Sequence, residues 1–168
     1  MASVIRNRQL VADNWLQLDA KRWLQVGEDG LVPDFPVGAD LLVPLELWRL
    51  RREDLSARAG GLGLIVEAWA DPESFADALP QLQLVAIRVA QFADGRAYSL
   101  ARLLRERHGY AGELRAVGDV LRDQLLYLQR CGFNAFALKY PDKAGEALAA
   151  FSELAAALRR PYAGARAA

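Results

Sequence analysis

Cysteine and histidine are almost absent from this chain, which has one of each among its 168 residues, Cys131 and His108. A structural zinc site takes four Cys or His ligands, and an iron–sulfur cluster takes several cysteine thiolates. Neither centre can be built from these two residues, and a single cysteine excludes an internal disulfide. We therefore expect no metal site and no redox centre in this chain, and the lack of disulfides fits a reducing compartment.

The chain also lacks an excess of charge of either sign and any long apolar run. Its 21 basic and 21 acidic residues give a net charge of zero, whereas nucleic acids and anionic membranes attract proteins with a basic excess. No stretch approaches the roughly 20 apolar residues of a membrane helix, and residues 1–15 contain no apolar run of signal-peptide length. We expect a cytoplasmic protein that binds neither nucleic acid nor membrane.

The first 40 residues differ in pattern from the rest and are expected to form a small β-hairpin or meander. Residues 15–18 (WLQL) and 23–26 (WLQV) alternate apolar and polar side chains, which is the period of a half-exposed strand. The run Gly27-Glu28-Asp29-Gly30 is typical of a turn. This extension should lie against the main domain at residues 41–160 or reach toward a partner, and residues 161–168 are expected to be a frayed tail.

From residue 41 onward, apolar runs alternate with amphipathic segments, which predicts one α/β domain. Strands that alternate with helices pair in parallel through right-handed crossovers. An open doubly wound sheet is the preferred arrangement. A half-barrel-like curved sheet is the alternative, because the chain is too short for a complete eightfold barrel. Five strands are expected, at residues 41–43, 62–66, 84–89, 113–117 and 133–138, with helices that include 44–59 and 142–158.

Ligands of parallel α/β proteins bind beyond the carboxyl ends of the strands, so the polar side chains that follow each strand are candidates for a site. Asp119 and Asp123 lie four residues apart on one face of an expected helix and are the candidate acid–base groups. Asp119 also suits the N-cap of that helix, which is the simpler role. The set predicted to bind an anion or a partner is Arg88, Asp94, Arg96, Ser99, Arg115, Gly118, Arg122 and Gln124.

Two arginines stand inside expected core strands, Arg88 in VAIRV and Arg115 in ELRAV. A buried charge is costly unless it is paired or solvated. If the two strands are neighbours, the guanidiniums can converge on one pocket and attract sulfate, phosphate or a carboxylate. The alternative is structural ion pairs with Glu67, Asp119 or Asp123, and the residues alone leave both interpretations open.

Three long motifs resemble a bacterial family of unknown function. They are DGRAYSLARLLRER at 94–107, GELRAVGDVLRDQL at 112–125 and RCGFNAFAL at 130–138. Members of this family are often described as oxidoreductases of sulfite reduction, and their genes commonly lie beside that of assimilatory sulfite reductase. The resemblance is strongest over residues 84–138. One departure is Asn134, where the family more often has Asp, and this favours a structural turn there.

The resemblance implies a pathway and leaves the mechanism open. The first hypothesis is an accessory protein that binds sulfite reductase or its electron donor and has no redox centre of its own. The second is a small enzyme acting on a sulfur oxyanion or another anionic metabolite at an arginine-lined site. The third is a flavin-dependent oxidoreductase, since flavin can bind without a dinucleotide fingerprint. The shortage of cluster ligands favours the first.

Overall fold

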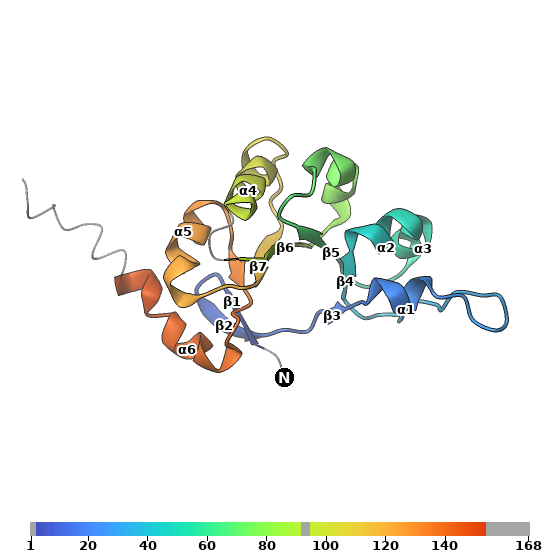
Figure 1. The fold of residues 1–168 in the computed structure, drawn as a ribbon, viewed down its shortest axis with the longest axis horizontal. Coiled ribbons are helices and arrows are strands. Elements are labelled where there is room, and N and C mark those ends of the chain that lie inside the picture. Colours follow the sequence, from blue (N-terminus) through green and yellow to red (C-terminus); the bar gives the residue numbers. More distant parts are fainter. Residues whose placement is uncertain (1–2, 92–94, 154–168) are drawn as a thin grey trace, which may run out of the picture.

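The sheet of the computed structural model curls into a half-barrel with helices on its outer side (Figure 1). The structure describes residues 3–91 and 95–153, so Asp94, the tail expected at 161–168 and the end of the helix expected at 142–158 lie outside the described residues. The described strands run in the order β2-β1-β8-β7-β6-β5-β4-β3. They are β1 (Ser3–Arg6), β2 (Gln9–Ala12), β3 (Leu16–Gln17), β4 (Leu41–Pro44), β5 (Leu62–Glu67), β6 (Leu84–Val89), β7 (Glu113–Gly118) and β8 (Ala135–Phe136).

The order of the strands explains the curl. Strands β3 to β8 pair in parallel, each beside the next in sequence. Because this order never reverses, successive right-handed crossovers carry their helices to one face of the sheet. The α/β class and the half-barrel alternative are confirmed. The preferred doubly wound sheet does not form, because it needs a reversal of strand order that would send helices to both faces.

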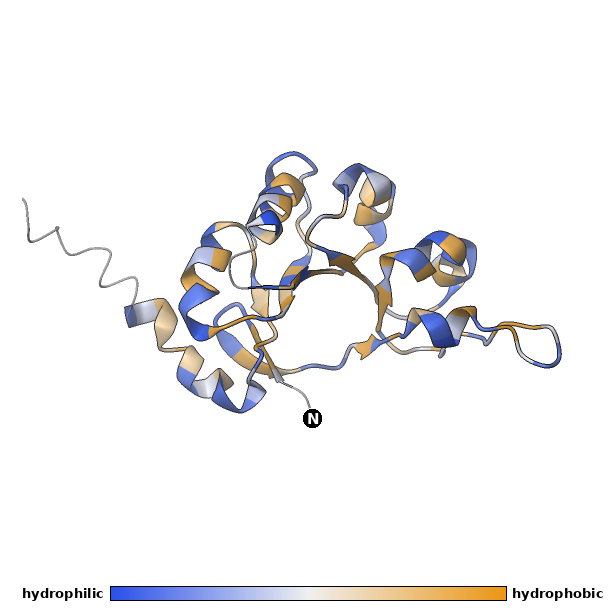
Figure 2. Ribbon diagram, viewed as in Figure 1, coloured by the Kyte–Doolittle hydropathy of each residue, from blue (hydrophilic) through white to orange (hydrophobic). Residues whose placement is uncertain are grey.

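The helices are short and carry both hydrophobic and hydrophilic residues (Figure 2), as helices covering one face of a sheet should. The helix expected at 44–59 is broken at Arg51 into two. Within the described residues, none of the helices has the length and apolar content to cross a membrane. The helices are α1 (Ala20–Leu24), α2 (Leu45–Leu50), α3 (Arg52–Ala57), α4 (Arg96–Glu106), α5 (Leu125–Arg130) and α6 (Ala144–Ala147), with 3-10 segments η1 (Pro72–Gln81), η2 (Arg122–Gln124) and η3 (Pro141–Lys143).

Alternate side chains of the strands build two separate apolar clusters, one on each face of the sheet. The larger cluster lies between sheet and helices and includes Leu64, Ile87 and Leu114. The smaller one is formed by Leu42, Ile65, Leu84 and Ala86, with Trp15 and Val117 packed against it. Since side chains alternate along a strand, Arg88 of β6 and Arg115 of β7 share the inner face with the smaller cluster.

The N-terminal hairpin exists, but it lies earlier in the chain than predicted. Strands β1 and β2 pair in antiparallel fashion around Asn7 and Arg8, which both have positive φ, as a tight two-residue hairpin turn requires. Of the two expected strands, only Leu16–Gln17 forms. The side chain of Asp19 accepts a hydrogen bond from the Lys21 N–H and so begins helix α1, which takes in Trp23. The expected turn at Gly27–Gly30 is confirmed by a 3.0 Å hydrogen bond.

The N-terminal residues also close the ring of the half-barrel. Strand β1 pairs with β8 and carries β2 as one edge of the sheet, while β3 is the other edge. These two edges are consecutive in the sequence, and residues 13–15 cross between them (Figure 1). Asp13 and Trp15 of this crossing segment contact the inner face. The chain thus bridges the opening that the curled sheet leaves.

Asn134 joins β7, β8 and the hairpin turn, and its replacement is expected to cost stability. Its side-chain oxygen accepts the Leu114 N–H at 2.7 Å, and its carbonyl accepts the Asn7 N–H at 2.8 Å. Asn134→Ala should lower the free energy of unfolding by about 1–2 kcal/mol, because the Leu114 N–H loses its side-chain acceptor.

Urea denaturation measures this loss, with Asn134→Asp as the control. Aspartate keeps an acceptor oxygen at the same place, so Asn134→Asp should cost less than half as much as Asn134→Ala. Equal losses from the two substitutions would show that the side-chain hydrogen bond contributes nothing.

Candidate functional site

Arg115 is enclosed by two carboxylates on the inner face of the sheet. Its side chain is 2% exposed. Nη1 donates to both oxygens of Asp13 at 3.0 Å, while Nε and Nη2 lie 2.8 and 2.7 Å from Oε1 of Glu113. All three guanidinium nitrogens are therefore taken by protein groups. The partners differ from those that the sequence suggested, because one comes from the crossing segment and the other is two residues away on β7.

Arg88 stands on the neighbouring strand β6 in a different environment. Its side chain is 41% exposed, and Nε donates to Oε1 of Glu67 at 3.0 Å. Glu67 is its cross-strand neighbour on β5 and one of the partners expected from the sequence. Within the described part of the chain, Nη1 and Nη2 of Arg88 take no further hydrogen bond. Arg88 therefore has two guanidinium nitrogens available to donate hydrogen bonds to a ligand, whereas all three nitrogens of Arg115 already donate to protein carboxylates.

A cavity of about 520 Å³ opens at the carboxyl ends of β3, β4, β5 and β6. We call it the mouth cavity. Arg88 lines it, and Arg115 does not, so the two arginines do not face one pocket together. The lining residues are Gln17, Leu18, Asp19, Ala20, Lys21, Pro44, Leu45, Glu46, Ile65, Glu67 and Arg88.

Asp119 is not the N-cap that the sequence suggested, and its carboxylate makes an ion pair instead. Its Oδ1 lies 2.6 Å from Nζ of Lys139, which follows β8. Hydrogen bonding to this carboxylate raises the pKa of Lys139. Leu121 has an extended backbone, so η2 begins only at Arg122, and the side chain of Gln124 accepts the Leu121 N–H at 2.9 Å. The capping role therefore falls to Gln124, which is buried.

Gly118 makes the turn from β7 into this loop. Its φ of +96° lies in the region that favours glycine, and a Cβ built there would stand 2.7 Å from the Val89 carbonyl oxygen. The same carbonyl accepts the Asp119 N–H at 2.8 Å. The glycine is thus explained by the close approach of β6 and β7.

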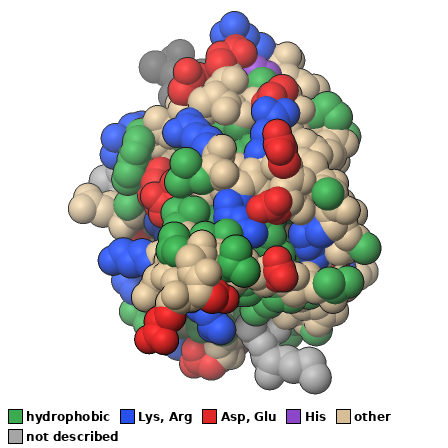
Figure 3. All heavy atoms as spheres, turned by 90° about the vertical axis from the view of Figure 1, so that its right-hand side faces the viewer, with side chains coloured by type: hydrophobic (Ala, Val, Ile, Leu, Met, Phe, Trp, Pro, Cys, Tyr) green, Lys and Arg blue, Asp and Glu red, His purple; other side chains and the backbone are tan. Residues whose placement is uncertain are grey.

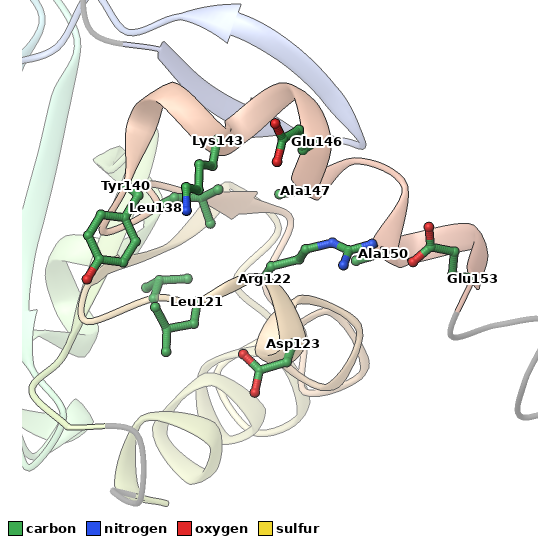
Figure 4. Close-up of a pocket in the computed structure, with 11 residues that line it drawn as sticks. Leu121, Arg122, Asp123, Leu138, Tyr140, Lys143, Glu146, Ala147, Ala150 and Glu153 are labelled. Carbon is green, nitrogen blue, oxygen red and sulfur yellow. Dashed lines mark hydrogen bonds and ion pairs between the residues drawn. The ribbon is translucent and has the colours of Figure 1, made fainter.

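A second hollow, of about 540 Å³, lies between the loop after β7 and helix α6 (Figure 4). We call it the groove. Apolar side chains form its floor, and charged ones stand at its edge, where Arg122 pairs with Glu153. Tyr140 is half-exposed at one end. The groove is lined by Val120, Leu121, Arg122, Asp123, Leu138, Tyr140, Lys143, Glu146, Ala147, Ala150 and Glu153.

The predicted site residues therefore fall into separate places. Arg122 and Asp123 line the groove, while Gln124 lies beneath it and donates to the Tyr98 hydroxyl at 3.3 Å. Arg96 and Ser99 begin helix α4 and line neither the groove nor the mouth cavity. The Arg96 guanidinium instead lies 5.2 Å from the ring centroid of the exposed Trp69.

The residues that sequence reasoning missed are the apolar wall of the groove and the crossing segment. Leu138, Ala147 and Ala150 have the pattern of ordinary core positions, and Ala147 and Ala150 are indeed almost fully buried, but all three line the groove together with Leu121. Asp13 lies 102 residues from Arg115, and no local pattern signals that contact. Residues 144–151 read AGEALAAF, and this run contains many small residues but no pattern that distinguishes a groove wall from an ordinary helix.

Cys131 and His108 lie outside these two hollows. Burial raises the pKa of the Cys131 thiol, so this cysteine is a packed neutral side chain rather than an activated nucleophile. His108 follows helix α4, with Nε2 3.8 Å from a Glu73 oxygen. Among the described residues, no three His, Cys, Asp or Glu side chains are grouped so that they could hold a metal ion.

Residues 63–167 match the model of a family described as "Bacterial protein of unknown function (DUF934)". The matched part begins within β5 and contains Arg88, Arg115 and all of the residues that line the groove. The hairpin, the crossing segment and β4 precede it. Among curated proteins, none matches this sequence.

Proposed function

The chain belongs to this bacterial family of unknown function, and from that premise we propose that it is an accessory protein of assimilatory sulfite reduction. In this role it binds sulfite reductase or the reductase's electron donor and supplies no redox centre of its own. The observation that carries the proposal is the groove, an apolar surface that the described residues leave open beside α6. Its composition fits a protein partner better than a catalytic centre.

The groove has the anatomy of a protein–protein contact. Such contacts have an apolar centre, a polar edge and aromatic or arginine side chains that contribute most of the affinity. Here Leu121 and Leu138 lie on the side of Tyr140, and the side chain of Arg122 extends past Ala150 toward Glu153 (Figure 4). Tyr140 is 51% exposed, and the ammonium groups of Lys139 and Lys143 lie 5.8 and 5.7 Å from its ring centroid. Tyr140 is therefore the natural anchor.

One side of the groove comes from the same motifs that resemble the sulfite-reduction family. Leu121, Arg122 and Asp123 belong to GELRAVGDVLRDQL, and Leu138 ends RCGFNAFAL. The second observation in favour is composition. With one cysteine and one histidine, the chain has too few ligands for an iron–sulfur cluster, which favours electron transfer to sulfite on the partner.

Tyr140→Glu should weaken capture of sulfite reductase at least about tenfold, because a buried charge would replace an aromatic anchor. The measurement is a pull-down with the tagged chain from bacteria grown on sulfate, scored by sulfite-reducing activity in the eluate. Leu50→Glu is the matched control. Leu50 is 70% exposed on α2, on the opposite side of the ring from α6 (Figure 1).

On the face of the molecule that carries α2, basic and acidic side chains are interspersed (Figure 3). A new carboxylate at residue 50 therefore changes the charge of this face little. Leu50→Glu should therefore capture as much reductase activity as the unmodified chain. The proposal fails if neither the unmodified chain nor the Leu50→Glu variant recovers the reductase or its electron donor. The groove assignment fails if both variants capture equally well.

A further inference from the structure

The mouth cavity is placed where parallel α/β folds bind small molecules. It opens at the carboxyl ends of four neighbouring parallel strands, inside the curl of the sheet. Its volume of about 520 Å³ is that of a site for a small metabolite. It shares no lining residue with the groove, so it needs an explanation of its own.

Arg88 is the group in this cavity that is arranged for a ligand. Its Nε donates to Glu67 at 3.0 Å, and this bond orients the guanidinium. Nη1 and Nη2 take no other hydrogen bond within the described residues. Two parallel N–H donors of a guanidinium match the two oxygens of a carboxylate. Arg115 on the next strand differs from Arg88, because its two acidic partners together occupy all three of its guanidinium nitrogens.

The other charges of the cavity disfavour a simple anion. Asp19, Glu46 and Glu67 line it together with Lys21 and Arg88, so acids outnumber bases. Glu67 is paired with Arg88, whereas Asp19 accepts only the uncharged backbone N–H of Lys21. The exposed carboxylates of Asp19 and of Glu46, in the first turn of α2, can therefore meet a positive group of a ligand. A sulfate or phosphate dianion would be repelled by this lining, whereas a ligand with both charges would not.

We propose that the mouth cavity binds a small zwitterion of the amino-acid type. Its carboxylate is held by Nη1 and Nη2 of Arg88, and its ammonium group lies toward Glu46. The apolar residues Leu18, Leu45 and Ile65 receive its side chain, which favours an uncharged one. The site is composite, because Arg88 and Glu67 lie in the family-matched part and residues 17–21 precede it.

The test is a thermal-shift screen of the intact chain with the twenty proteinogenic L-amino acids at millimolar concentration. At least one uncharged amino acid should raise the Tm by about 2–6 °C. Its N-acetyl derivative and its amide should not raise the Tm, because each lacks one of the two charges. Calorimetric titration then gives the Kd, and Arg88→Gln should raise that Kd at least about tenfold.

Arg107→Gln is the matched control. Arg107 is also paired with a glutamate, Glu73 at 3.1 Å, but it does not line the cavity, so its replacement should leave the Kd unchanged. The inference is overturned if no amino acid shifts the Tm, or if sodium sulfate or acetate shifts it equally. It is also overturned if Arg88→Gln binds as well as the unmodified chain. Sulfite reductase takes no part in this assay, so its outcome is independent of the groove.

Discussion

Replacing Arg115 with alanine is expected to lower the free energy of unfolding by about 3–5 kcal/mol. The guanidinium is 2% exposed and bonded to Asp13 and Glu113, whose side chains are only 20% and 10% exposed. Its removal would leave two poorly solvated carboxylates side by side. Arg6, whose Nη1 lies 3.4 Å from Oε2 of Glu113, would still be paired with one of them. Urea denaturation followed by circular dichroism measures the loss.

Arg88→Ala is the matched control for this prediction. It removes an arginine from the same face of the adjacent strand, but the Arg88–Glu67 pair is about 40% exposed on both sides, and solvated pairs contribute at most about 1 kcal/mol. A double-mutant cycle between Arg115→Ala and Asp13→Ala should give a coupling energy of about 1 kcal/mol or more. If Arg115→Ala costs no more than Arg88→Ala, or if the cycle is additive, Arg115 does not fasten the crossing segment to the sheet.

The second large effect is expected at Gly118. Gly118→Ala should destabilise the fold by about 1–2 kcal/mol through its left-handed backbone alone. The collision of the new Cβ with the Val89 carbonyl at 2.7 Å adds to this, since a backbone oxygen inside a sheet cannot move aside. The same denaturation experiment measures it. The loop that this turn directs forms one wall of the groove, so capture of the reductase should weaken in parallel.

Gly95→Ala provides the comparison, because Gly95 begins the preceding crossover helix, α4, under different constraints. Its φ is −71°, and a Cβ there meets no atom of the described residues within 4 Å. The substitution should leave stability unchanged or slightly raised, since alanine restricts the unfolded chain. Equal losses from the two substitutions would contradict the account of the turn at Gly118.

The parallel strands and their crossover helices were predictable because their patterns are local. Residues 84–89 and 113–117 are short apolar runs followed by turn residues, and both are strands as expected. The curl of the sheet was not decided by any local pattern. It depends on sequential strand order and on β1 pairing with β8, which are long-range choices made by packing.

The N-terminal region shows how a local pattern can mislead. The sequences WLQL and WLQV have the same alternation, yet the first contains β3 and the second starts inside α1. Asp19, a helix-capping residue between them, decides the difference. The strand pair that does form, β1 with β2, has a weaker alternation and depends on its turn and on β8.

The residues of the candidate site were named from the sequence, whereas their arrangement in space was not predicted. Arg88 and Arg115 were recognised as unusual because charges inside core strands need partners. Which of the two has donors left for a ligand depends on Asp13, whose contact with Arg115 spans 102 residues. Arg122 and Asp123 were correctly placed after β7, but the groove beside them also needs Ala147 and Ala150 of the α6 region.

The proposed accessory function is tested most directly by calorimetric titration of the purified chain into assimilatory sulfite reductase, and in parallel into its electron donor. We predict saturable binding to one of the two at a fixed stoichiometry. Tyr140→Glu should weaken that binding at least about tenfold, and Leu50→Glu should leave it unchanged. Absence of binding to both proteins would contradict the account.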